Sequence, residues 1–360
     1  MENFIIAEAG SNHNGSIDKA FDLIDIAKKA NANSIKFQFI YADGLYLPEY
    51  NLNDGYIKSD VHRKRKKEEF SDDDWNKIWS YSKKRDLDIS ASVFCSRGVS
   101  LLKELGCTYV KIASTDLTNH KLIRDVSNNF DNVLISTGMA SMNEIAESVN
   151  CAIKANSNID LKLMHCVSLY PCPFKDSNIS RISELQKRFD IEVGYSDHTN
   201  DLRSAILACS KGVTLFEKHF TYDKNQPGFD HAHAQDPFEL ELYVQTINEC
   251  SKAEEWVENN PKMQNGESIT KIRARRGVYV NKDLKPGHQI QEDDLLYVRP
   301  STNFTCTDPD EFIGLKLKES IKKYSAIGIE SNSVIQVSSN WNAANDFWNA
   351  EMKEKRMNKT

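Results

Sequence analysis

Gly194-Tyr-Ser-Asp-His-Thr199 and Phe216-Glu-Lys-His-Phe-Thr221 are two polar hexapeptides, and each ends a short apolar run. Between them, the apolar residues of the segment 201–210 recur at helical spacing. The pattern predicts a strand, a helix and a second strand. In a parallel barrel the carboxyl ends of the strands open onto the active-site face, so we expect His198 and His219 to approach each other on neighbouring strands.

Two imidazoles at neighbouring strand ends have two interpretations. With Asp197, Glu217 and Lys218 beside them, they favour a metal-assisted site. They are equally compatible with two unrelated histidines that are each hydrogen-bonded in place. The two hexapeptides alone do not decide between these alternatives.

The composition limits the class of protein. A length of 360 residues suits one barrel of about 250 residues and a smaller domain. A net charge of −6 argues against nucleic-acid and membrane-surface partners, and no apolar run approaches the roughly 20 residues of a membrane span. The chain enters a predicted strand at Phe4, so we expect no signal peptide. Its 8 cysteines form no CxxC pair, which is typical of buried thiols in a cytoplasmic protein.

Strand-like and helix-like runs alternate through the first 250 or so residues. No Gly-x-Gly-x-x-Gly turn follows the first strand, so the alternation favours a closed (β/α)8 TIM barrel over a Rossmann sheet. The predicted strands are Phe4–Glu8, Ser34–Gln38, Leu87–Val93, Tyr109–Ile112, Val133–Ser136, Lys162–His165, Ile191–Tyr195 and Val213–Glu217. The predicted helices are 17–30, 72–84, 99–105, 122–127, 142–155, 179–188, 202–210 and 237 to about 259.

The ends of these strands carry polar and ionisable side chains. Lys36 lies near the end of the second predicted strand and Lys111 near the end of the fourth. Ser114, Ser136 and Ser168 lie at the fourth, fifth and sixth strand ends. A lysine facing a barrel mouth is costly unless an anion meets it. The set therefore suggests a phosphate or carboxylate substrate.

A long polar connection, residues 40–71, follows the second strand. Loops of this length in a compact fold are usually lids or disordered. The basic run His62-Arg-Lys-Arg-Lys-Lys67 is compatible with attraction of an anionic substrate, but Glu68 and Glu69 beside it favour a solvated face.

The composition changes after Asn259. We predict a barrel over residues 1–259, a linker over 260–275, a small β-rich domain over 276–337 and a polar tail over 338–360. The predicted β segments of the small domain are 277–280, 287–290, 295–299 and 333–337. Three aromatic residues in the tail, Trp341, Phe347 and Trp348, suggest an amphipathic helix.

The ordered motifs resemble the sialic acid synthase (N-acetylneuraminate synthase) family, in which a phosphoenolpyruvate-condensing TIM barrel precedes an antifreeze-like (SAF) domain. The resemblance covers about residues 4–337. It is carried by Ile6-Ala-Glu8, Asn12-His-Asn-Gly15, Lys36-Phe-Gln38, Lys111-Ile-Ala-Ser114, Ser136-Thr-Gly-Met139, Gly194-Tyr-Ser-Asp-His-Thr199, Glu217-Lys-His219 and Gly228-Phe-Asp-His231.

The resemblance implies an enzyme, a homodimer in which the SAF domain of one chain caps the partner's barrel, and a divalent metal. The metal is typically Mn2+, with Mg2+ or Co2+ possible, and its ligands fall on His198 and His219. The catalytic positions fall on Glu8, His198, His219 and Asp230. Substrate-binding positions fall on Lys36, Gln38, Ser92, Lys111, Ser114, Asp116, Ser136, Ser168, Tyr170, Ser196, Glu217 and, from the partner chain, Arg299.

Several positions depart from the family pattern on the sugar side. Ser92-Val-Phe94 stands where Thr-Pro-Phe is common, Asp116 replaces a glutamate, Ser168 replaces an asparagine, and Phe229 and Ala234 replace a proline and a serine. These departures leave the acceptor open.

Three classes of function remain. The first is a synthase that joins phosphoenolpyruvate to N-acetylmannosamine or a related 2-acetamido sugar, including a legionaminic or pseudaminic acid synthase. The second is another metal-dependent aldolase-type barrel. The third is a silent barrel with a SAF binding module.

Overall fold

The computed structural model describes residues 2–52, 55–253, 265–306 and 308–357. The chain divides into two compact units, Met1–Glu255 and Trp256–Thr360. The predicted limits of the four segments remain predictions, because the division between the units lies outside the described residues.

The first unit is a closed barrel of eight parallel strands in the order β1-β10-β9-β8-β7-β6-β5-β2. Each predicted strand is present, with ends within two residues of the predicted ones. The strands are β1 (Phe4–Gly10), β2 (Ser34–Phe39), β5 (Asp88–Val93), β6 (Val110–Ile112), β7 (Asn132–Ser136), β8 (Asp160–His165), β9 (Val193–Asp197) and β10 (Leu215–His219). The predicted TIM barrel is therefore confirmed.

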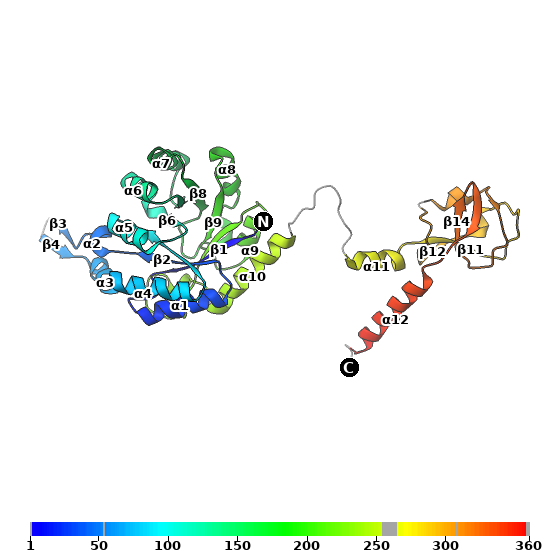
Figure 1. Ribbon diagram of the computed structural model, residues 1–360, viewed down its shortest axis with the longest axis horizontal. Helices are drawn as coiled ribbons and strands as arrows, with labels where there is room; N and C mark the ends of the chain where they lie inside the picture. Colours follow the sequence, from blue (N-terminus) through cyan, green and yellow to red (C-terminus); the bar gives the residue numbers. More distant parts are fainter. Residues whose placement is uncertain (1, 53–54, 254–264, 307, 358–360) are drawn as a thin grey trace. The chain divides into compact units, whose positions relative to one another are not determined.

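Helices lie outside the strands (Figure 1). Ser71 and Ser141 begin two of them with complete capping boxes, in which Asp74 and Glu144 accept hydrogen bonds from the serines' backbone amides. The helices are α1 (Ile17–Lys29), α4 (Asp72–Lys84), α5 (Ser96–Leu105), α6 (His120–Asn129), α7 (Met142–Ala155), α8 (Ser180–Phe189), α9 (Arg203–Cys209) and α10 (Pro237–Ala253).

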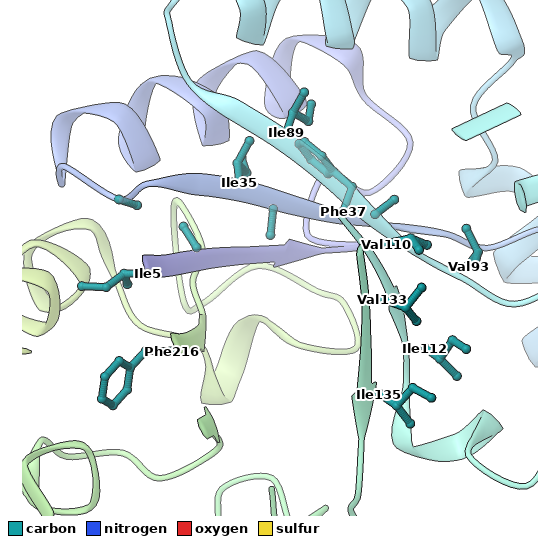
Figure 2. Close-up of a cluster of buried hydrophobic side chains, with 14 of the residues drawn as sticks. Ile5, Ile35, Phe37, Ile89, Val93, Val110, Ile112, Val133, Ile135 and Phe216 are labelled. Carbon is teal, nitrogen blue, oxygen red and sulfur yellow. The ribbon is translucent and has the colours of Figure 1, made fainter. Parts of the chain in front are cut away.

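The main hydrophobic core fills the space between the strands and these helices. Figure 2 shows part of it, with Ile5, Ile35 and Ile89 among the side chains that leave the outer face of the strands. Because successive residues of a strand point to opposite faces, these apolar residues alternate with the residues that point into the barrel. Full burial of each such side chain contributes about 1.5–3 kcal/mol.

The barrel interior has an apolar floor. Ile6, Tyr109, Leu134, Met164 and Leu215 form a buried cluster there, separate from the main core. Gly194 leaves room for this floor, because a Cβ at that position would lie 2.6 Å from the sulfur of Met164 and 2.7 Å from the carbonyl oxygen of Leu215. The glycine that opens the first hexapeptide is therefore required by packing.

The connection between β2 and α4 is more structured than the sequence predicts. It contains α2 (Ala42–Leu45), a hairpin of β3 (Glu49–Leu52) and β4 (Gly55–Lys58), and α3 (Asp60–Glu68). The basic run lies on α3. Arg65 of this run is 7% exposed, so the prediction of a solvated face is wrong at this position.

The second unit contains the small β domain. Strand β11 (Gly277–Val280) pairs with β12 (Leu295–Val298), and β15 (Ser333–Gln336) lies between β13 (Lys316–Leu317) and β14 (Ile327–Glu330). The predicted segment 287–290 forms only an isolated bridge, Gln289 to Lys316, and β13 and β14 were not predicted.

Two helices flank the β domain in the sequence. Helix α11 (Asn265–Ala274) lies within the span predicted as a linker, and α12 (Trp341–Met357) forms the predicted helix of the tail. They contact each other, and the guanidinium of Arg273 lies 4.4 Å from the ring centre of Phe347. Across the part of the chain that is described, no helix has the length and apolar character to cross a membrane.

Candidate active site

A cavity of about 410 Å³ opens at the carboxyl ends of the barrel strands. Most of the predicted site residues line it, although the sequence places them far apart. They are Glu8, Lys36, Gln38, Ser92, Lys111, Ser114, Ser136, Ser168, Tyr170, Ser196, His198, Glu217 and His219.

The base of the cavity is a layer of paired charges. The ammonium of Lys36 lies 2.5 Å from a carboxylate oxygen of Glu8 and 3.5 Å from one of Glu217, and it donates a 2.8 Å hydrogen bond to Ser92. Glu217 also contacts the ammonium of Lys111 and accepts a 2.8 Å hydrogen bond from Ser196. Glu217 therefore joins the two lysines.

The strand register brings this layer together. Glu8 pairs with Lys36 between β1 and β2, Ser92 pairs with Lys111 between β5 and β6, and Ser196 pairs with Glu217 between β9 and β10. All of these side chains point inward from the level just above the apolar floor.

The two carboxyl groups of the layer differ in proton affinity. Burial raises the pKa of Glu8 to about 7, although the charge of Lys36 opposes this shift. Burial also acts to raise the pKa of Glu217, but Lys111 and Lys36 outweigh it and hold that pKa below its usual range. Glu8 can therefore exchange a proton near neutral pH, as a general acid or base must.

Serine hydroxyls crowd one wall of the cavity around Gly138. A Cβ at Gly138 would lie 2.3 Å from the hydroxyl of Ser168 and 2.8 Å from that of Ser114, which accepts a hydrogen bond from the Gly138 amide. The hydroxyls of Ser136 and Ser168 are buried and have no hydrogen-bond partner. Free hydroxyl donors beside Lys111 suit the oxygens of an anion.

His198 and His219 lie side by side at the ends of β9 and β10, with ring centres 5.6 Å apart. Nδ1 of His198 lies 2.7 Å from the carbonyl oxygen of Val167, which assigns the proton to Nδ1 and leaves Nε2 as a lone-pair donor. Nδ1 of His219 is buried without a partner. Burial lowers the pKa of His198 to about 4 and that of His219 well below its usual value, so both rings are neutral.

These two imidazoles fit a metal ion. They are neutral, each has a nitrogen free for coordination, and His198 is anchored through its other nitrogen by a backbone carbonyl, as ligating histidines usually are. Among the described residues, no group of three or more His, Cys, Asp or Glu side chains is placed to hold a metal. A metal bound here would therefore keep positions for water or substrate oxygens.

The sequence analysis missed His233, which lies on the short turn after Asp230. Its ring centre is 5.8 Å from that of His219 and 5.0 Å from that of Tyr170, which in turn lies 4.2 Å from His198. Nε2 of His233 is buried and has no hydrogen-bond partner. The sequence Asp230-His-Ala-His233 could have indicated this residue, because it places two histidines within three residues of the predicted site residue Asp230.

Asp230 is close to the cavity although it does not line it. Gly10, at the end of β1, has a φ of +56° and lies close to three polar side chains. A Cβ at this position would lie 3.1 Å from a carboxylate oxygen of Asp230, 3.4 Å from the amide nitrogen of Gln38 and 3.5 Å from a carboxylate oxygen of Glu8. Gln38 donates a 3.1 Å hydrogen bond to Glu8. Glu8, Gln38 and Asp230 are thus gathered around Gly10.

Two predicted site residues lie elsewhere. Asp116 is buried on a turn, where it accepts hydrogen bonds from Thr115 and Asn119, and Thr115 lines the cavity instead. Arg299 follows β12 in the second unit, where its side chain is exposed. Its predicted role in a partner's site stays a prediction.

Several cavity residues were not predicted. They are mainly apolar side chains from loops and from helix α2, whose positions follow no strand register, together with one threonine and one arginine. They are Ile40, Leu45, Tyr46, Arg65, Phe94, Ala113, Thr115, Met139 and Cys166.

Comparisons with known proteins agree with this architecture. The model of the NeuB family matches residues 23–258, and the SAF domain model matches residues 275–327. The N,N'-diacetyllegionaminic acid synthase of Legionella pneumophila is 32% identical over 325 residues, 88% of this chain and 91% of the relative. The pseudaminic acid synthase of Campylobacter jejuni serotype O:2 is 31% identical over 327 residues, 89% and 93% of the two chains.

A solved structure is similar as well. The N-acetylneuraminic acid (sialic acid) synthetase of Leptospira borgpetersenii, crystallised in complex with citrate, superposes with a TM-score of 0.66 at 31% identity, covering 75% of this chain and 91% of that one. The family match spans more than half of the chain, and the barrel and SAF domain follow in the family's order. The chain is therefore an enzyme of the NeuB family, the family of the sialic acid-type synthases.

Proposed function

We propose that this enzyme condenses phosphoenolpyruvate with the open-chain aldehyde of a 2-acetamido sugar, consuming water and releasing phosphate and a nine-carbon 2-keto acid. The observation that carries the proposal is the layer of buried lysines and carboxylates, with two neutral histidines beside it in one cavity. The names of the relatives as acidic-sugar synthases support the same product class.

Lys36 and Lys111 bind phosphoenolpyruvate in this proposal. The substrate carries about three negative charges near neutral pH, and two buried ammonium groups with neighbouring hydroxyl donors can compensate them. Ser114, Ser136 and Ser196 supply these hydroxyls, because all three line the cavity beside the lysines.

His198 and His219 hold the divalent metal, for which Mn2+ is our first candidate and Mg2+ or Co2+ are alternatives. Such an ion would act as a Lewis acid toward the aldehyde oxygen of the sugar. The histidines themselves orient the ion, since the carbonyl oxygen of Val167 fixes the ring of His198.

Carbon 3 of phosphoenolpyruvate then attacks the aldehyde carbon, and positive character develops at carbon 2. The carboxylate of Glu217 stabilises this charge, because it is ionised and buried. Water adds to carbon 2 and gives a proton to Glu8, whose pKa of about 7 suits this exchange, and this proton balances the one that the former aldehyde oxygen takes up to become a hydroxyl. The hemiketal phosphate that results loses phosphate and leaves the keto group.

The acceptor contacts Gln38, Asp230 and Tyr170 in this arrangement, and Arg299 of a second chain completes the site in a homodimer. N-acetylmannosamine is our first candidate for the acceptor. The precursors of legionaminic and pseudaminic acids are alternatives, in keeping with the relatives' names.

The test measures phosphate released from phosphoenolpyruvate with each candidate sugar, with and without Mn2+, followed by the mass of the product. We expect release only when both sugar and metal are present. Release without an amino sugar would favour another aldolase-type barrel, and no release with any acceptor would favour a silent barrel with a SAF binding module.

A further inference from the structure

Asp197 and Lys218 form a buried ion pair on the outer face of the barrel wall. The ammonium of Lys218 lies 3.2 Å from a carboxylate oxygen of Asp197, and each side chain is at most 3% exposed. Because successive residues of a strand point to opposite faces, both side chains point away from the cavity that Ser196 and Glu217 line. No step of the proposed condensation uses this pair.

Asp197 fixes the turn on which His198 lies. One of its carboxylate oxygens accepts a 2.8 Å hydrogen bond from the amide of Thr199 and a 2.7 Å hydrogen bond from the Thr199 hydroxyl. The result is an Asx-turn, in which a side chain closes the backbone two residues further on, and His198 is its central residue. The hydroxyl of Ser204, on α9, lies 2.7 Å from that of Thr199. The backbone of His198 is therefore held by the side chain that precedes it.

Lys218 joins this turn to the strand that carries His219. Its ammonium also donates a hydrogen bond to the carbonyl oxygen of Thr199, so it contacts the residues on both sides of His198. Lys218 directly precedes His219 at the end of β10. It lies 5.3 Å from the centre of the Tyr243 ring of α10, a cation–π distance. One ammonium thus connects the segments that carry the two imidazoles.

The backbone pairing of β9 with β10 ends at this same ion pair. Beyond it, the two histidines are bound to different parts of the chain. The carbonyl oxygen of His198 accepts a 2.8 Å hydrogen bond from the amide of Cys172. That of His219 accepts a 2.8 Å hydrogen bond from the amide of Gln235. The ion pair is therefore the cross-strand contact next to both imidazoles.

We propose that Asp197 and Lys218 are positioning residues, whose ion pair holds the imidazoles of His198 and His219 at the separation that suits one metal ion. The inference rests on the proposed function, in which the two histidines hold the divalent ion. Stability alone is a weak reason to bury such a pair, because apolar residues in its place are often equally or more stabilising. Residues that orient the ligands of a metal change its affinity about 10- to 100-fold when they are replaced.

The experiment measures Mn2+ binding to the full-length protein without substrates, by electron paramagnetic resonance of the free ion. Lys218→Met and Asp197→Asn should each weaken Mn2+ binding by about 10- to 100-fold. Each should also lower the thermal midpoint, because it leaves a buried charge without its partner. Wild-type Mn2+ affinity in both variants would overturn the inference.

The double variant Asp197→Asn/Lys218→Met separates positioning from stability. It buries neither charge, so its thermal midpoint should return toward that of the wild-type protein. Its Mn2+ affinity should stay weak, since the link between the turn and β10 remains broken. A double variant that regains both the midpoint and the affinity would show that the pair only stabilises the fold.

Lys162→Met is the matched control. Lys162 lies 2.5 Å from Glu192, so this pair also joins β8 to the start of β9, but it lies toward the amino ends of the strands, away from the cavity. Its removal should leave the Mn2+ affinity unchanged. An equal loss of affinity in Lys162→Met would contradict the assignment, because any cross-strand ion pair would then have the same effect.

The proposed function can fail separately, if the wild-type protein binds no Mn2+. Crystal structures of the wild-type protein and of the double variant then decide the inference. A changed separation of the His198 and His219 rings in the variant supports it, and an unchanged separation refutes it.

Discussion

Each unit of the molecule contains a buried carboxylate cluster, and the two clusters have different roles. In the barrel, Glu8 and Glu217 are paired with lysines below an open cavity. In the second unit, Asp294 is fully buried between Lys282, at 2.5 Å, and His288, at 2.6 Å.

The two clusters differ in the partners that their buried polar atoms contact. Asp294 also accepts a 2.9 Å hydrogen bond from the amide of Gln291, so it closes a turn of its own chain. Around Glu8 and Glu217, in contrast, the Ser136 and Ser168 hydroxyls and Nδ1 of His219 are buried without partners. A carboxylate whose two oxygens both face cations or amides of its own unit stabilises a local structure. Buried donors and acceptors without partners beside a cavity indicate a ligand site.

The largest expected effect follows from Lys36→Met, which would leave two carboxylates without one of their cations. Breaking a buried pair costs about 3–5 kcal/mol, and we expect a loss of that size in the free energy of unfolding together with the loss of activity. Chemical denaturation and phosphate release measure the two effects.

Glu8→Gln added to Lys36→Met is the control for this change. It removes one unpaired charge, so it should restore part of the stability but none of the activity. A stable and active Lys36→Met variant would contradict the view that the barrel layer is built for an anion.

His219→Ala separates chemistry from folding in the same cavity. We expect activity to fall by about a hundredfold or more, because Lewis-acid polarisation is worth several kcal/mol. The thermal midpoint should change little, since Nδ1 of His219 has no partner to lose. Manganese-dependent turnover at the wild-type rate in this variant would show that His219 is not a metal ligand.

Arg299 would be a chemically active group contributed by the second unit. Arg299→Ala and His198→Ala should each be inactive, and mixed dimers of the two should regain part of the activity if Arg299 serves a partner's barrel. Mass spectrometry confirms subunit exchange. Absence of recovery after confirmed exchange would rule out the arrangement in trans.

Asp294→Asn should have the smallest effect on activity. Burial acts to raise the pKa of Asp294, but Lys282, His288 and the Gln291 amide outweigh it and lower this pKa to about 2. The carboxylate therefore stabilises the folded unit above about pH 4, and this contribution is lost as the pH falls through about 2.

Thermal unfolding of the full-length protein between pH 2 and pH 7 tests this prediction. At neutral pH, Asp294→Asn should lower the stability of the second unit by about 1.5–3 kcal/mol, the worth of a hydrogen bond to a charged group. A variant with wild-type stability across this range would show that the cluster does not stabilise the unit.

Strand periodicity made much of the barrel and its charged layer predictable. Lys36 and Lys111 lie on strands whose apolar alternation is clear, so their inward direction follows from the pattern. Arg65 was not predictable in this way, because on a helix of consecutive cations only packing decides which side chain turns inward. The direction of the Asp116 side chain was not predictable for a similar reason, since hydrogen bonds within a turn set it. In the small domain, β13 comprises two residues, too few for any periodicity.

The bridge that Glu217 forms between Lys36 and Lys111 makes anion binding an exchange of counter-ions. Both lysines already pair with Glu217, so under the proposed function an incoming phosphate would replace a carboxylate partner and would meet no unpaired cation. The affinity for phosphate would then be the difference between two sets of ion pairs, and the carboxylates offset the cost of burying the two ammonium groups. Anions that cannot outcompete a glutamate in this geometry are rejected without any steric barrier.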